Sequence, residues 1–148
     1  MEEKQDYTAD DMLKLENQLC FPLYACAREV VKKYKPFLDD IDLTYTQYVT
    51  MMVLWEKPSV TSKEIGERLH LDSGTLTPVI KKLAEKGLVT RARSAEDERN
   101  LVVALTDAGL ALRDRAACIP GQMGKCISLS PEDAGTLYRI LYQLLGSM

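Results

Sequence analysis

Hydrophobic positions recur at helical spacing along much of the chain, and this pattern predicts the first elements. We expect a helix over about residues 17–35, ending before Pro36, because a proline disfavours helical geometry in the residue ahead of it. A second helix is expected over 44–55, with Thr44 as its N-cap. Its apolar residues occur nearly all round, so we expect this helix to be buried.

Two short helices joined by a tight turn are predicted in the middle of the chain. The first, over 61–71, opens with a capping box in which Thr61 and Glu64 satisfy each other's backbone N–H groups. The second follows a small polar turn and ends at Gly87, a residue type favoured just after a helix. Two such helices in succession predict a helix-turn-helix.

A β-hairpin is predicted directly after this motif. Residues 88–93 and 101–105 have the composition of strands, and the polar run 94–100 connects them as the tip of a wing. The predicted fold class is therefore mainly α with a small β-hairpin, in a single domain. This domain comprises a winged helix-turn-helix over about 44–106 and flanking helices over about 13–36 and 107–148.

The C-terminal region is expected to hold two helices separated by a loop. The first runs from Asp107 to about Cys118 and is broken at Pro120. The following loop contains Cys126, and the last helix starts with Ser130 as N-cap and a proline at its first position.

Composition narrows the class of protein. The chain has 148 residues, 46% of them hydrophobic, which suits one globular domain. Its start is acidic, unlike a secretory signal, and no apolar run approaches the roughly 18 residues of a membrane span, so we expect a cytoplasmic protein. The four cysteines include no Cys-x-x-Cys pair and His70 is the only histidine, so we expect no metal site and no cofactor.

The net charge of −3 hides a local excess of positive charge. Residues 73–95 contain five cations and one acid, a balance of +4. A small polar turn at the start of a recognition helix lets it approach base edges, while flanking cations meet phosphates. Taken singly, these residues could be helix caps and a solvated face; in sequence they predict DNA binding. The predicted DNA contacts are Ser73, Thr75, Thr77, Lys81 and Lys82 on the helix, and Arg91, Arg93 and Arg99 on the wing.

One cysteine stands out as a candidate reactive thiol. Cys20 falls near the start of the first helix, where unpaired N–H groups favour the thiolate. Tyr24, four residues on, shares its helical face, so a phenol can lie beside the sulfur. Cys26 points elsewhere and is expected to be a small core residue.

Several segments together resemble the organic-hydroperoxide-sensing repressors of the MarR family. The similarity spans roughly residues 13–120, and its most specific motifs surround the cysteine and the recognition helix. The matching segments are Leu15-Glu16-Asn17-Gln18-Leu19-Cys20-Phe21, Tyr34-Lys35-Pro36, Leu43-Thr44-Tyr45, Leu71-Asp72-Ser73-Gly74-Thr75-Leu76-Thr77-Pro78 and Asp97-Glu98-Arg99. This resemblance adds Pro78 and Asp97 to the predicted DNA-binding residues.

The resemblance implies a homodimeric repressor that releases its operator DNA when an organic hydroperoxide oxidises Cys20. The terminal helices would then form the dimer. In that family two tyrosines of the partner subunit hydrogen-bond the reactive sulfur, and Tyr34 and Tyr45 match those positions. Cys126 resembles the resolving cysteine of members that form a disulfide, and a mixed disulfide with a small cellular thiol is the alternative. Cys118 matches less well and is expected to be a helix-packing residue.

Two other functions are consistent with parts of the sequence. A MarR-type repressor released by a small phenolic ligand would use Tyr24, Tyr34, Tyr45 and Trp55 as pocket walls and leave Cys20 without a role. A thiol peroxidase would use the cysteine but has no use for a basic recognition helix and wing. We therefore expect a regulator and not an enzyme.

Overall fold

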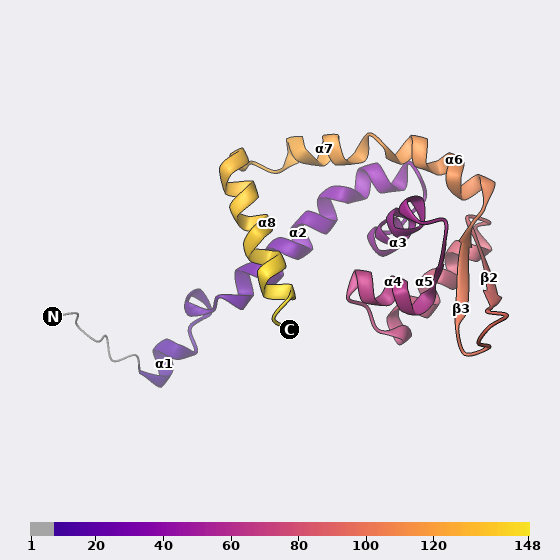
Figure 1. The fold of residues 1–148 in the computed structure, drawn as a ribbon. Coiled ribbons are helices and arrows are strands. Elements are labelled where there is room, and N and C mark those ends of the chain that lie inside the picture. Colours follow the sequence, from indigo (N-terminus) through magenta and orange to yellow (C-terminus); the bar gives the residue numbers. More distant parts are fainter. Residues whose placement is uncertain (1–7) are drawn as a thin grey trace. The chain divides into compact units, whose positions relative to one another are not determined.

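The computed structural model describes residues 8–148 (Figure 1). The acidic start, on which the expectation about a secretory signal partly rests, lies outside the described residues. The chain divides into two compact units, and the division falls between Arg115 and Ala116. The elements in chain order are α1 (Ala9–Met12), a 3-10 turn (Leu15–Asn17), α2 (Cys20–Asp39), α3 (Tyr45–Glu56), β1 (Ser59–Thr61), α4 (Ser62–Leu69), α5 (Ser73–Glu85), β2 (Val89–Arg93), β3 (Leu101–Leu105), α6 (Asp107–Ala116), α7 (Ile119–Cys126) and α8 (Pro131–Leu145).

The first long helix, α2, begins close to its predicted start but ends later than predicted. It begins at Cys20 and continues through Pro36 to Asp39, so the prediction that it ends before Pro36 is wrong. A proline inside a helix removes one backbone hydrogen bond, but it does not prevent the helix from continuing when later residues are anchored. Leu38, in the last turn, is buried and provides that anchor.

Side-chain caps fix the starts of the next helices. Thr44 and Gln47 form a full capping box at α3, so the predicted start of that helix is confirmed. At α4, Thr61 Oγ1 accepts from the Glu64 N–H, but the Glu64 carboxylate pairs with Lys57 Nζ at 3.1 Å. The predicted reciprocal box is therefore wrong in its second half, because a cation from the end of α3 competes for the carboxylate.

The wing and a short strand form a three-stranded antiparallel sheet in the order β1-β3-β2. The hairpin is confirmed, with Val89 opposite Leu105 and Arg93 opposite Leu101. The strand β1, which pairs Val60 with Val103, was not predicted. Three residues carry too little pattern to show a strand, and β1 exists because the long-range partner β3 supplies its hydrogen bonds.

The core of the first unit lies among α3, α4, α5 and the sheet. The α3 helix is largely buried, as predicted, and the Trp55 indole N–H donates to the Gly109 carbonyl of α6 at 2.9 Å. Gly87 has a φ of +73°, the left-handed geometry expected of a residue that ends a helix. The most completely buried side chains in this unit are Thr50, Met51, Leu54, Ile65, Ile80, Leu83 and Val103. This is a winged-helix fold, and the predicted fold class is confirmed.

The second unit contains one helix where a loop was expected. Residues 119–126 form α7, so the predicted break at Pro120 and the predicted loop around Cys126 are wrong. Pro120 occupies the second position of the helix, where a backbone N–H has no helical partner to lose. The predicted start of α8 is confirmed, because Ser130 Oγ accepts from the Asp133 N–H at 3.1 Å. Across the described residues, none of the helices has the length and apolar character to cross a membrane.

Candidate functional site

The N-terminal turn of α5 is exposed and held by its own cap. Asp72 is the N-cap, and its carboxylate accepts from the Thr75 backbone N–H at 2.9 Å and from the Thr75 hydroxyl at 3.0 Å. These hydrogen bonds hold the pKa of Asp72 below its usual value, so the cap stays charged. The first residue of α5 is therefore Ser73, and Pro78 lies inside the helix without ending it.

The threonines of this turn face solvent with their hydroxyl protons already committed. Thr75 donates to Asp72, and Thr77 Oγ1 donates to the Ser73 carbonyl at 2.6 Å. Each hydroxyl oxygen can still accept a hydrogen bond, and each methyl group can contact a thymine methyl. The buried face of the same helix is formed by Leu76, Ile80 and Leu83, so its orientation is set by packing.

Cations continue from this turn along the helix and onto the wing. Lys81 and Lys82 are exposed on α5, and Lys81 lies 4.0 Å from Glu85, a weak surface pair. Arg91 and Arg93 alternate with Ala92 along β2, so their side chains share one face of the strand. The Arg93 guanidinium also donates to the Glu98 carbonyl at 3.0 Å.

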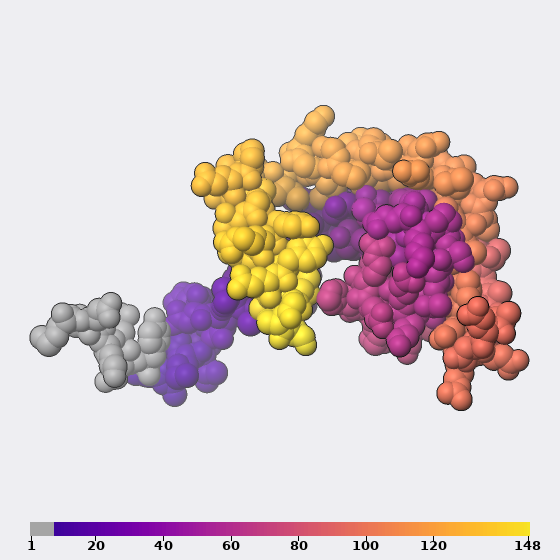
Figure 2. Space-filling model, in the orientation of Figure 1, coloured from indigo at the N-terminus to yellow at the C-terminus, as the bar shows by residue number. Residues whose placement is uncertain are grey.

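The wing tip is shaped by Asp97. Its carboxylate accepts from the Arg99 backbone N–H at 3.0 Å, and its carbonyl accepts from the Asn100 N–H at 2.9 Å. These bonds close the tip and leave the Arg99 side chain exposed. Figure 2 shows the wing, between magenta and orange, protruding from the surface of its unit. The structure thus gives Asp97 a role in presenting Arg99.

Cys20 is the first residue of α2 and is exposed. Tyr34 lies fourteen residues further along this unbroken helix, about 21 Å away along its axis. Tyr34 therefore cannot contact the sulfur of its own chain. The ring of Tyr24 is exposed and lies under the Arg28 guanidinium, 5.5 Å from its centroid; its predicted place beside the sulfur stays a prediction.

Tyr34 and Tyr45 lie together in an aromatic cluster. Their ring centroids are 4.9 Å apart, and Tyr48 lies 5.9 Å from Tyr34 and 6.3 Å from Tyr45. Burial raises the pKa of both Tyr34 and Tyr45, and the neighbouring Tyr45 adds to the shift at Tyr34. Both phenols are therefore protonated hydrogen-bond donors at neutral pH.

Sequence reasoning missed Tyr48 as a member of this cluster. It is buried, packs between the two tyrosines and Trp55, and follows Tyr45 by one helical turn. That i, i+3 spacing was the available signal.

The other three cysteines differ in exposure and setting. Cys26 is exposed, so the prediction that it is a core residue is wrong; Leu38 is the one fully buried side chain of α2. Cys118 is also exposed, at the N-cap of α7 with its sulfur 3.9 Å from Gln122 Oε1, so the prediction that it is a helix-packing residue is wrong. Cys126 ends α7 and is half-buried.

Comparisons with known proteins agree with this arrangement. The family described as "Transcriptional regulator SarA/Rot" matches residues 32–115. The organic hydroperoxide resistance transcriptional regulator of Bacillus subtilis is 49% identical over 138 residues, which cover 93% of this chain and 94% of that protein. AbfR is a protein of Staphylococcus epidermidis. The structure of reduced AbfR bound to DNA aligns with a TM-score of 0.77 at 32% identity, covering 93% of this chain and 96% of that one. The disulfide form of AbfR aligns with a TM-score of 0.61 at 32% identity, over 93% and 94% of the two chains.

The fold, with its exposed recognition helix and wing, defines a winged-helix transcriptional regulator. Its relatives are regulators and not enzymes, which removes the thiol peroxidase alternative. The chain belongs to the SarA/Rot and MarR-like family of transcriptional regulators, and its resemblance to the organic hydroperoxide resistance members is confirmed.

Proposed function

We propose that this protein is a repressor that binds operator DNA as a homodimer and releases it when an organic hydroperoxide oxidises Cys20. The observation that carries the proposal is the separation of an exposed cysteine from a protonated tyrosine pair by an unbroken helix. The tyrosines are too far from their own Cys20, so they serve a cysteine only if it comes from a second copy.

DNA binding is assigned to the N-terminal turn of α5 and to the wing. The AbfR structures, 32% identical to this chain, contain DNA with the reduced and with the overoxidised protein. We place the small exposed turn of α5 in the major groove and Arg99 in the neighbouring minor groove, where the negative potential favours arginine. Because its proposed partner is operator DNA, we assign the protein to the cytoplasm.

The terminal helices are assigned to the dimer interface. Large apolar side chains are exposed on α2 and, separately, on α8, and exposed apolar surface marks an interaction site. A second copy of the same chain covers such faces in a symmetric dimer. The side chains concerned are Phe21, Leu23, Tyr24 and Val31 on α2, and Leu137, Tyr138, Ile140, Tyr142 and Leu144 on α8.

The proposed redox step is nucleophilic attack by the Cys20 thiolate on one peroxide oxygen. The S–O bond forms and the O–O bond breaks, so the sulfur is oxidised to a sulfenic acid. The hydroperoxide is reduced to an alcohol, and a proton is taken up by the leaving alkoxide. The partner's tyrosines would donate hydrogen bonds to the sulfur and to the departing oxygen.

The direct test is operator binding before and after oxidation. An operator selected from a random duplex library by the reduced protein should be released after one equivalent of cumene hydroperoxide, and a dithiol should restore binding. Mass spectrometry shows when the thiol is completely oxidised. Unchanged operator affinity at that point would refute the proposal.

Arg99→Ala is expected to weaken operator binding by about 1–3 kcal/mol, because it removes one groove contact. The measurement is fluorescence anisotropy with the reduced protein at physiological salt. Arg113→Ala, which removes an exposed arginine from α6, serves as the control and should leave affinity unchanged. Equal affinity of Arg99→Ala and wild type, with the fold intact by circular dichroism, removes Arg99 from the interface.

Tyr34→Phe and Tyr45→Phe are each expected to slow oxidation of Cys20 about ten-fold, because each variant loses one hydrogen bond to a charged group. Binding of the reduced protein to its operator should stay nearly the same, because the rings still pack in the aromatic cluster. Stopped-flow measurement of thiol loss under excess hydroperoxide gives the rate. Wild-type rates in both variants would show that the phenols have no part in the reaction.

A further inference from the structure

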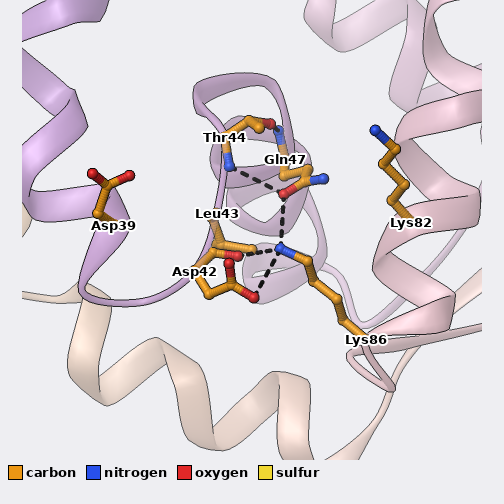
Figure 3. Close-up of a pocket in the computed structure, with 7 residues that line it drawn as sticks. All are labelled: Asp39, Asp42, Leu43, Thr44, Gln47, Lys82 and Lys86. Atoms are coloured by element: carbon orange, nitrogen blue, oxygen red, sulfur yellow. Dashed lines mark hydrogen bonds and ion pairs between the residues drawn. The ribbon is translucent and has the colours of Figure 1, made fainter.

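The C-terminal end of the recognition helix is tied to the loop between α2 and α3 (Figure 3). Lys86 Nζ donates to the Asp42 backbone carbonyl and forms an ion pair with the Asp42 carboxylate at 3.2 Å. The same ammonium donates to Gln47 Oε1 at 3.4 Å. One side chain at the end of α5 therefore contacts both the loop and the first turn of α3.

The loop that receives Lys86 has an uncommon backbone geometry at Asp42. Asp42 has a φ of +52°, in the left-handed region that few residues other than glycine adopt. The Arg115 guanidinium of α6 also donates to the Asp40 carbonyl, two residues before Asp42. Gln47 Oε1 also accepts from the Thr44 N–H at 3.0 Å, so the acceptor of Lys86 is itself held by the capping box.

Lys86 differs in these contacts from the other lysines of the recognition helix. Its side chain is 30% exposed, against 62% for Lys81. Lys82 lines the same cavity of about 530 Å³ as Lys86, yet no hydrogen bond or ion pair joins it to the residues drawn around it (Figure 3). Lys82 is thus available to a phosphate, whereas the ammonium of Lys86 contacts Asp42 and Gln47 within the protein.

We propose that Lys86 is a positioning residue for operator binding, which sets the orientation of α5 from the loop where α2 ends. This inference rests on the proposed function and adds a route by which a displacement of α2 reaches the recognition helix. The contacts that carry it are those to the Asp42 carbonyl and to Gln47. The Asp42 carboxylate is 90% exposed, so its ion pair with Lys86 contributes little by itself.

The route follows the chain from the thiol to the DNA surface. Cys20 starts α2, and Asp39 ends it and leads directly into the Asp40–Leu43 segment. A shift of the end of α2 moves the Asp42 carbonyl, and Lys86 converts that shift into a rotation of α5. Recognition helices of a dimer must meet two half-sites at a fixed spacing, so a small rotation is sufficient to lower affinity.

Lys86→Met removes the ammonium and keeps the aliphatic stem. We expect the reduced protein to lose about ten-fold in operator affinity, within the range of coupling between elements. The slope of log Kd against log salt should stay at the wild-type value, because no phosphate contact is lost. The comparison variant, Lys82→Met, should reduce that slope by about one, because it removes a phosphate contact.

Two controls separate positioning from loss of charge or stability. Lys57, which follows α3, also joins two elements, because it forms an ion pair with Glu64 on α4. Lys57→Met should leave operator affinity unchanged. Lys86→Arg retains a cation with donors and should recover most of the affinity. Unchanged affinity in Lys86→Met would overturn the proposal, as would a slope lowered by about one, which identifies Lys86 as a phosphate contact.

Operator binding by oxidised protein tests whether a displacement of α2 reaches α5 through Lys86. In Lys86→Met the ratio of oxidised to reduced Kd should shrink relative to wild type, whereas Lys57→Met should keep the wild-type ratio. A wild-type ratio in Lys86→Met, in a protein that responds to cumene hydroperoxide, would overturn the route. If wild-type protein does not respond at all, the proposed function fails, while the salt slope of the reduced protein still decides whether Lys86 positions α5.

Discussion

Cys20→Ser is expected to bind the operator as tightly as the reduced wild type and to remain bound after hydroperoxide treatment. A serine hydroxyl is not ionised at neutral pH and does not attack the peroxide bond, whereas a cysteine thiolate does. The substitution exchanges sulfur for oxygen at an exposed position at the start of α2, so the fold should be unaffected. Wild-type affinity should fall roughly 5–150-fold under the same treatment, the usual range of coupling between two sites.

The matched control is Cys26→Ser, because Cys26 is exposed on the same helix, six residues from Cys20. It should retain the full wild-type response, since it lies elsewhere around the helix. Both variants are measured by anisotropy with the same operator before and after one equivalent of hydroperoxide. A response that survives in Cys20→Ser and disappears in Cys26→Ser would move the sensor to Cys26.

Cys126→Ser is expected to abolish a covalent dimer that forms in oxidised wild-type protein. In this prediction the Cys20 sulfenic acid condenses with the Cys126 thiol, which forms an S–S bond and releases water. A solved relative, AbfR, exists in a disulfide form. Cys126 ends α7 and is half-buried, so the bond requires the end of this helix to reach Cys20 of the second subunit within about 7 Å between Cα atoms.

Non-reducing gel electrophoresis after one equivalent of hydroperoxide gives the result directly. Wild type should show a band at twice the monomer mass, and Cys126→Ser should not. Cys118→Ser is the control, because Cys118 is an exposed cysteine at the other end of α7 and should keep the band. A dimer band that persists in Cys126→Ser excludes Cys126. A monomer that gains the mass of a small thiol, in wild type supplied with one, shows that a mixed disulfide forms instead.

A disulfide of this kind would also explain release of the DNA in physical terms. It would draw the start of α2 in one subunit toward the end of α7 in the other. Two recognition helices must meet half-sites about 34 Å apart, so this displacement opposes operator binding. The Lys86 contacts give the displacement a path to α5 inside each subunit.

Local features of the sequence determined the elements that depend on residues close together in the chain. The N-caps Thr44 and Ser130 and the turn glycine Gly87 act within three or four residues, so their helix boundaries are where the sequence predicted them. The apolar stripe of α5 and the hairpin followed from periodicity, because each repeats over a few residues. The candidate thiol and the basic recognition surface were found from residue type and position in the same way.

Contacts between distant residues decided the rest. Pro36 remains inside α2 because Leu38, two residues further on, is buried. The strand β1 exists because β3 pairs with it. A short window of sequence shows neither of these contacts. The aromatic cluster joins α2 to α3, and Lys86 reaches Asp42 across 44 residues of chain. Such contacts form only when packing of the whole unit brings the side chains together, so the sequence determined the candidate groups and the tertiary structure decided which of them meet.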